Sequence, residues 1–181
     1  MMVVAVVGIS GVGKTTLVRE LADRIPIKHL QASALIKAEQ ARLGLSACTS
    51  EELRVGPVID NQSLLVSGFR NALTVSDGAV VFDGHVMIDA GDRIIEVPDS
   101  VFADLGCDHI VVITEDPEII ARRRARDVAR QRPVRSVSQI SSQQHLSVEI
   151  AKRIAQSLGI PCTVIRSADP RTLEQLIRPE N

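Results

Sequence analysis

The sequence predicts an α/β protein, with a central parallel sheet and helices on both of its faces. Three apolar runs have the length of a buried strand, at 2–7, 79–82 and 109–114. Segments with helical periodicity separate these runs, and a glycine-rich turn joins the first run to the first helix. Strands that alternate with helices in this way form parallel sheets that are covered on both sides.

The remaining elements follow from start and stop signals. The first helix should end near Arg24 because Pro26 cannot continue it, with Thr16, Leu17 and Leu21 facing inward. Helix starts are expected at Asp99, at Pro117 and at Asp169-Pro170. Further strands are expected near 28–31 and at 161–165, and further helices at 32–42, at about 51–75 with an interruption at Gly56-Pro57, and at about 138–158. An antiparallel hairpin is expected at 85–97, where Asp89 and Asp92 are interpreted as turn residues.

The turn after the first strand carries a phosphate-binding pattern. Gly8-Ile9-Ser10-Gly11-Val12-Gly13-Lys14-Thr15 matches G-x-x-x-x-G-K-[ST] in the strand-to-helix setting that the motif requires. Its glycines let successive N–H groups point inward as an anion site, and Lys14, expected as a solvated charge, lies on the β- and γ-phosphates. The sequence therefore predicts the three-layer P-loop NTPase fold and an ATP site formed by Gly8, Ser10, Gly11, Val12, Gly13, Lys14, Thr15 and Thr16.

Asp83 ends the second buried run, at the edge where open α/β sheets place their ligands. A carboxylate there can hold the water shell of Mg²⁺ opposite the Thr15 hydroxyl, so both are predicted metal-site residues, with Asp83 acting through water. A turn aspartate that caps the next glycine is the alternative. His85 either contacts substrate or has a structural role.

Seven arginines lie between residues 122 and 135, with Asp127 as the single acid among them. On a helix Arg123, Arg126 and Arg130 share one face, whereas Arg122 and Arg124 point elsewhere. Guanidinium groups pair bidentately with phosphate oxygens, so the segment is interpreted as an arginine lid over the transferred phosphoryl group. A solvated basic helix or a nucleic-acid surface is the alternative.

Composition sets the remaining bounds. The 181 residues are 45% apolar without a membrane-length run, which favours one soluble domain over 1–181 with no membrane partner and no signal peptide, in the cytoplasm. The three cysteines are interpreted as small apolar fillers. The net charge is -1 and the aromatic content is 2%, and neither value favours a nucleic-acid partner. The composition is compatible with a monomer or a homo-oligomer.

These residues resemble the P-loop nucleoside monophosphate kinases, and most closely the archaeal-type adenylate kinases and their nuclear relatives. The matching features are Gly8–Thr16, Asp83-Gly84-His85, and the arginines at 122–123 and 130–132. The resemblance implies a γ-phosphoryl transfer from Mg·ATP to a nucleoside monophosphate or a related small acceptor. It implies an acceptor subdomain at about 33–75, a lid at about 122–135, and an adenine-lining loop at 164–170 that contains Ser167 and Ala168.

The resemblance also implies roles for single residues. Lys14, Asp83, Arg123, Arg130 and Arg132 would be catalytic. Arg54, Gln62, Arg70 and His85 would contact the acceptor nucleotide or nucleoside. The lid has more arginines than the family pattern and the 83–98 hairpin lies outside the usual motif, so an acceptor other than AMP stays open. An ATPase, or a nucleotide-dependent RNA-linked assembly factor, is the alternative function.

Overall fold

The computed structural model describes residues 1–45, 58–73, 78–127 and 132–178. The strands are β1 (Met2–Val7), β2 (Ile27–Gln31), β3 (Ala79–Asp83), β4 (Met87–Asp89), β5 (Ile94–Glu96), β6 (His109–Thr114) and β7 (Cys162–Arg166). The helices are α1 (Lys14–Ala22), α2 (Ala32–Arg42), α4 (Val58–Ala72), α5 (Asp99–Asp104), α6 (Pro117–Arg126), α7 (Val137–Leu158) and α8 (Pro170–Ile177).

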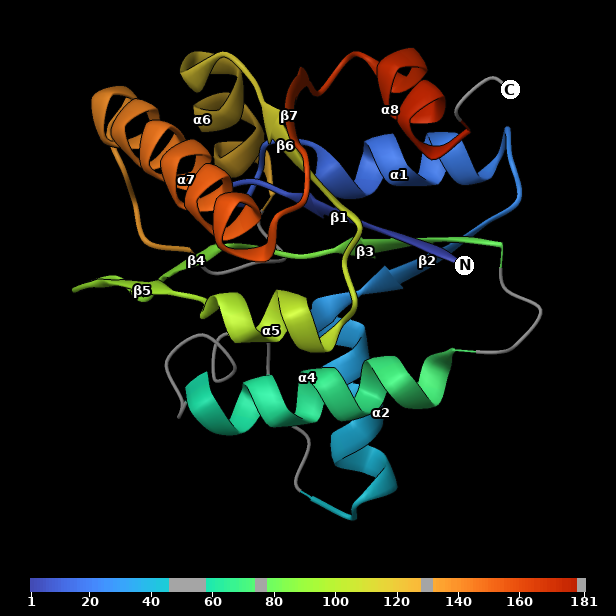
Figure 1. The fold of residues 1–181 in the computed structure, drawn as a ribbon. Coiled ribbons are helices and arrows are strands. Elements are labelled where there is room, and N and C mark those ends of the chain that lie inside the picture. Colours follow the sequence, from blue (N-terminus) through green and yellow to red (C-terminus); the bar gives the residue numbers. More distant parts are fainter. Residues whose placement is uncertain (46–57, 74–77, 128–131, 179–181) are drawn as a thin grey trace.

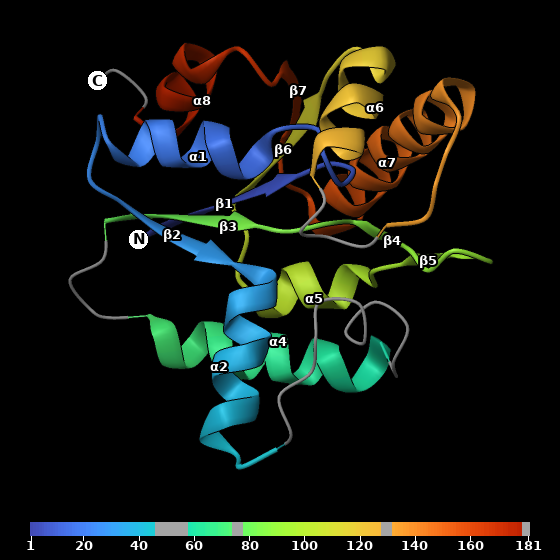
Figure 2. The ribbon, with the colours of Figure 1, turned by 180° about the vertical axis from the view of Figure 1, so that it is seen from behind.

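Five strands form one parallel sheet in the order β2-β3-β1-β6-β7 (Figure 1). α1 and α8 cover one face of this sheet, whereas α5 and α7 cover the other, and Figure 2 shows the same layers from behind. α2 and α4 pack against each other beside β2 and β3. The expected fold class, a central parallel sheet with helices on both faces, is confirmed.

The core is built from the strands that the apolar runs predicted. Val4 to Val7 of β1 are completely buried, as are Val80 and Val81 of β3. Phe69 of α4 meets Phe82 of β3 edge to face, with ring centroids 6.1 Å apart, and this contact fixes α4 to the sheet. Aliphatic side chains without polar atoms favour strands that are buried on both faces, which explains the position of β1 at the centre.

Most expected elements lie within one or two residues of the observed ones. α1 ends at Ala22, and within it Thr16 is exposed whereas Val18 is buried, so the inward position predicted for Thr16 is wrong. Cys107 is buried and Cys162 half-buried, while Cys48 and the first part of the 51–75 segment lie outside the described residues. Within the part of the chain that the structure describes, no helix is long and apolar enough to cross a membrane.

The expected hairpin is present as β4 and β5, which pair antiparallel in a separate two-stranded sheet. It lies at the same end of the molecule as the P-loop, because β4 begins four residues after β3 ends. Asp89 accepts a hydrogen bond from the Gly91 N–H at 3.1 Å, as a turn aspartate does. Asp92 is exposed at the tip of the hairpin.

Candidate active site

The P-loop, residues 8–15, joins β1 to α1 with three glycines at positive φ. These are Gly8 at 148°, Gly11 at 83° and Gly13 at 111°. A Cβ atom on Gly8 would lie 2.7 Å from the Ile113 carbonyl oxygen, and one on Gly13 would lie 3.0 Å from Nη1 of Arg123. The loop therefore needs glycine for both its backbone angles and its close neighbours.

Lys14 is buried, with 6% of its surface exposed, so the expected solvated charge is a wrong prediction. Its Nζ donates to the Gly8 carbonyl oxygen at 2.8 Å and lies 3.4 Å from the Ile9 carbonyl oxygen. The side chain thus folds back over its own loop, where the carbonyl oxygens of Gly8 and Ile9 lie next to the ammonium group. Buried charge of this kind requires polar partners, and the loop carbonyls provide them.

Thr15 and Asp83 are in direct contact. The Thr15 hydroxyl donates to Oδ2 of Asp83 at 2.7 Å, and Asp83 is only 4% exposed. The parallel register sets Asp83 of β3 opposite Val6 of β1, one residue before the strand turns into the P-loop. The two predicted metal-site residues are therefore brought together, and their oxygen atoms suit a hard cation such as Mg²⁺.

Several groups act on the Asp83 carboxyl. Burial raises its pKa, but the His29 ring, the Lys14 ammonium and the Thr15 hydroxyl lower it more, so the pKa lies below the ordinary value. Nε2 of His29 lies 3.4 Å from Oδ2 of Asp83. Asp83 is consequently ionised at neutral pH, as a partner for a hydrated cation must be.

His85, which follows β3, also contacts the P-loop. Its Nδ1 donates to the Gly8 carbonyl oxygen at 2.8 Å, which requires the proton on Nδ1. The same Nδ1 lies 3.5 Å from Nζ of Lys14. His85 therefore has the loop-ordering contact that was one of its two interpretations.

Three arginines converge on the P-loop from the 122–135 segment. Arg123 donates from Nη1 to the Val12 carbonyl oxygen at 2.7 Å, and Arg124 donates from Nε to the Ser10 carbonyl oxygen at 2.9 Å. Arg132 donates from Nε to the Ser10 hydroxyl at 2.9 Å. Arg122 points into solvent, with 63% of its side chain exposed. The cationic groups thus gather where a triphosphate would lie.

Arg124, which was expected to point away from the face shared by Arg123, Arg126 and Arg130, also reaches the P-loop. An ideal helical wheel separates Arg123 from Arg124 by about 100°. Both side chains nevertheless reach the P-loop, because α6 lies across it and a long guanidinium can approach from either flank. Arg130 lies outside the described residues.

Glu115 is a site residue that the sequence patterns did not indicate. It is 7% exposed, and its Oε2 lies 3.4 Å from Nη2 of Arg123 and 2.5 Å from the Ser167 hydroxyl. Burial raises the pKa of Glu115, but hydrogen bonds from the Ser167 hydroxyl and the Asp116 N–H lower it more, so the pKa lies below the ordinary value. Glu115 therefore holds Arg123 against the loop. Its place directly after β6 was the available signal, since that strand ends at the same edge as Asp83.

The residues predicted to contact the acceptor do not all line one cavity. Gln62 and Arg70 line a cavity between α4 and α5, where Nη2 of Arg70 lies 3.5 Å from Oδ1 of Asp104. His85 lines a different cavity, of about 90 Å³, next to the P-loop. Ser167 meets Arg123, and Ala168 is exposed beside it. Arg54 lies outside the described residues.

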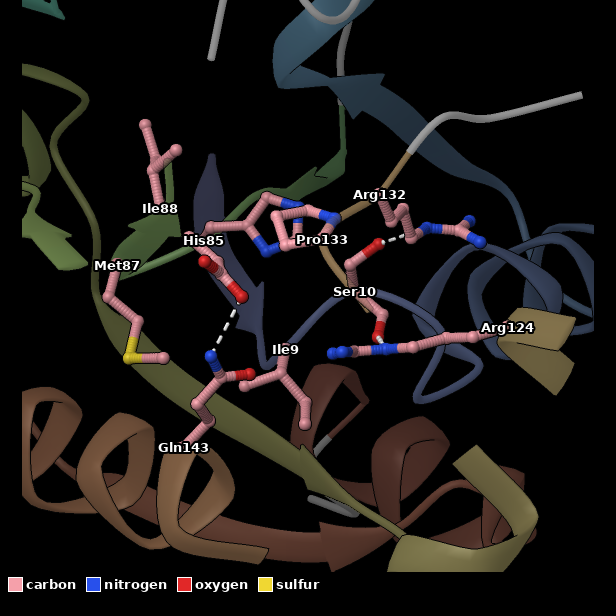
Figure 3. Close-up of a pocket in the computed structure, with 10 residues that line it drawn as sticks. Ile9, Ser10, His85, Met87, Ile88, Arg124, Arg132, Pro133 and Gln143 are labelled. Atoms are coloured by element: carbon pink, nitrogen blue, oxygen red, sulfur yellow. Dashed lines mark hydrogen bonds between the residues drawn. The ribbon is translucent and has the colours of Figure 1, made fainter. Parts of the chain in front are cut away.

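The cavity next to the P-loop is bounded by the loop, the hairpin, the arginine segment and α7 (Figure 3). Its lining residues are Ile9, Ser10, His85, Met87, Ile88, Asp89, Arg124, Arg132, Pro133 and Gln143. Apolar side chains thus face a basic wall within one space. Such a combination of apolar surface and few convergent polar groups is typical of a small-molecule site.

The fold and the site together define a nucleotide-dependent P-loop kinase. They combine a parallel sheet and a glycine-rich phosphate loop with a carboxylate at the end of the neighbouring strand and with arginines that contact the loop. Residues 7–141 match the family AAA_17, described as an AAA domain, and the chain belongs to this family. The sequence prediction of a P-loop kinase related to adenylate kinases is confirmed.

Individual relatives agree with this assignment. An adenylate kinase from Thermococcus onnurineus is 25% identical over 178 residues, which cover 97% of this chain and 91% of the relative. An adenylate kinase from Pyrococcus abyssi is 28% identical over 182 residues with the same coverage. Among solved structures, a shikimate kinase from Bacteroides thetaiotaomicron matches with a TM-score of 0.58 at 17% sequence identity. The match covers 97% of this chain and 98% of the shikimate kinase chain. That last similarity shows the shared fold.

Proposed function

We propose that this protein transfers the γ-phosphoryl group of Mg·ATP to a nucleoside monophosphate, as an adenylate kinase does. The observation that carries the proposal is the hydrogen bond between Thr15 and Asp83 beside a P-loop on which three arginines converge. Phosphoryl transfer needs positioning and charge neutralisation more than a protein base, and this site offers both.

The residues present fit ATP and Mg²⁺. N–H groups of residues 8–15 and the Lys14 ammonium would hold the β- and γ-phosphates, with the adenine near Ser167 and Ala168. The Thr15 hydroxyl would hold the cation directly and Asp83 would hold it through water, because both oxygens already face each other at 2.7 Å. Mg²⁺ held by these residues would supply charge neutralisation for the phosphate oxygens.

The acceptor phosphate would lie between the P-loop and the arginine segment. One of its oxygen atoms attacks the γ-phosphorus, the bond to the β,γ-bridging oxygen breaks, and the electron pair leaves with ADP. Arg123 and Arg132 would stabilise the equatorial oxygens as the phosphoryl group moves, since each already donates to the loop that holds it. Nη1 of Arg132 is buried and has no partner among the described residues, which fits an anion at that place.

Product analysis tests the proposal. The purified protein is incubated with ATP, Mg²⁺ and, in separate reactions, AMP, GMP, CMP, UMP, a nucleoside or shikimate. A new nucleoside diphosphate that depends on one monophosphate supports the proposal. Release of phosphate without a new phosphorylated product would instead indicate an ATPase, and phosphorylation of the nucleoside or shikimate would change the acceptor class.

A further inference from the structure

Asp89 is the centre of a hydrogen-bonded cluster at the end of β4. Its Oδ2 accepts from Nε2 of Gln143 at 2.7 Å and from Nε of Arg135 at 3.0 Å. Its Oδ1 accepts from Nη2 of Arg135 at 2.8 Å and from the Gly91 N–H at 3.1 Å. The hairpin is therefore tied both to α7 and to the end of the arginine segment.

This cluster fixes the orientation of the Gln143 amide. Burial raises the pKa of Asp89, but Arg135 and Gln143 lower it more, so the carboxyl stays ionised and can only accept hydrogen bonds. Gln143 must then turn its NH₂ group toward Asp89. Its Oε1 consequently faces the other way, toward Ile9 and the cavity, as Figure 3 shows.

Oε1 of Gln143 therefore lines the cavity, and the Gln143 side chain is largely buried, with 9% of its surface exposed. An amide oxygen that faces a cavity favours a hydrogen-bond donor as its neighbour. In the same cavity Arg132 has a side chain that is 8% exposed and an Nη1 atom with no partner among the described residues. The cavity thus offers sites for an anion and for a neutral donor.

We propose that Gln143 selects the acceptor: its Oε1, held in place by Asp89, accepts a hydrogen bond from a hydroxyl or amino group of a nucleoside monophosphate whose phosphate lies against Arg124 and Arg132. This inference rests on the proposed function. Gln143 would touch the acceptor, whereas Asp89 is a positioning residue that acts through Gln143. The apolar side chains of Met87 and Ile88 then exclude water from this hydrogen bond.

The test compares acceptors that differ by one donor. Initial rates are measured for AMP, for its 2′-deoxy analogue and for inosine monophosphate, which lacks the amino group. In the parent protein one of the two analogues should have a kcat/KM about tenfold lower than AMP, which identifies the donor as a ribose hydroxyl or the base amino group. In Gln143→Met this difference should vanish through a higher KM for AMP, with kcat changed less.

Two further variants complete the design. Gln156→Met changes an exposed glutamine on the same helix and should keep the parental discrimination. Asp89→Asn can donate to Oε1 and let the amide turn, so it should lose discrimination as Gln143→Met does. Binding of a non-hydrolysable ATP analogue should stay within about twofold in all three variants, which shows that each is folded.

The outcomes separate the two proposals. If the parent phosphorylates AMP and Gln143→Met discriminates among the three acceptors as the parent does, the role of Gln143 is wrong while the proposed function stands. A parent that treats the three acceptors alike also overturns that role. If the parent phosphorylates no monophosphate, the proposed function falls, and the inference about Gln143 falls with it.

Discussion

The hydroxyl of Thr15 donates a 2.7 Å hydrogen bond to Oδ2 of Asp83. Thr15 is the second residue of α1 and Asp83 is the last residue of β3, and 68 positions of sequence separate them. The parallel register of β1 and β3 sets Asp83 beside the end of β1, from which the P-loop leads to Thr15, and Asp83 is buried there. A cation that enters this position meets oxygen ligands that need little rearrangement.

Asp83→Asn should lower kcat by about 100-fold and raise the Mg²⁺ concentration needed for half-maximal rate, because a neutral amide holds the hydrated cation less well. ATP affinity should change much less, since the P-loop provides most phosphate contacts. Rates across a Mg²⁺ titration measure this. Asp92→Asn, at the exposed hairpin tip, is the control. Equal losses of ATP affinity and rate would assign Asp83 a structural role.

Arg123→Ala and Arg122→Ala form a matched pair on adjacent positions. Arg123 contacts the P-loop whereas Arg122 is exposed, so the first substitution should reduce kcat about 100-fold and the second should have little effect. Steady-state kinetics and binding of an ATP analogue measure both. If the segment instead bound nucleic acid, both variants would keep their turnover, and each would lower the salt slope of RNA or DNA binding by about one.

Lys14→Ala should abolish detectable transfer and also reduce the free energy of unfolding. The buried ammonium donates to the Gly8 carbonyl, and loss of a charged hydrogen bond costs about 1.5–3 kcal/mol. Urea denaturation at pH 7 measures the second effect, with exposed Lys37→Ala as the control. Retained turnover at saturating Mg·ATP would contradict the catalytic role, and unchanged stability would contradict the structural one.

Strand and helix positions were accessible from the sequence because they depend on local patterns. β6 and α2 coincide with their predicted ranges, since an unbroken apolar run indicates a buried strand and the residues of 32–42 are mostly strong helix formers. The P-loop was equally clear, because its glycines have a fixed spacing. What the pattern could not give was the burial of Lys14, which depends on backbone carbonyls that no side-chain pattern records.

Long-range polar contacts were the least accessible part of the site. Glu115 meets Ser167 across 52 residues, and Asp89 meets Gln143 across 54. Each of these residues has an ordinary local role as a helix start, a turn or a helix-face residue, and that local role gave the sequence interpretation. Their second partners arise from the strand order of the sheet and from where the hairpin packs, which tertiary structure alone determines.

Glu39 of α2 leads to a prediction about how the stability of the fold depends on pH. Hydrogen bonds from Arg42 and from the Ser67 hydroxyl lower its pKa from 4.5 to about 2, and Asn71 adds a third donor. A lowered carboxyl pKa stabilises the fold at pH values above 4.5, and this contribution is lost as the pH falls toward about 2. Glu39 connects α2 to α4, so the effect should appear in global unfolding.

The corresponding experiment is urea denaturation of the parent and of Glu39→Gln between pH 7 and pH 2.5. The parent should be more stable at pH 7, and the difference should shrink as the pH falls below about 4.5. Glu20→Gln, an exposed change on α1, should show a small difference that varies little with pH. A Glu39→Gln difference that stays constant over this range would refute the linkage.

β4 and β5 form their own sheet and share no ladder with the five-stranded sheet in the described part of the chain. The wall that they give to the cavity is therefore held by side-chain packing against the core and by side-chain hydrogen bonds, rather than by ladder bonds to the central sheet. Substitutions at the less buried hairpin positions, between residues 88 and 96, should therefore disturb the P-loop and the Thr15–Asp83 pair little. A library of variants confined to these hairpin positions and to position 143 would change the acceptor preference while the phosphoryl-transfer residues stay the same. The acceptor preference of natural relatives can diverge in the same way.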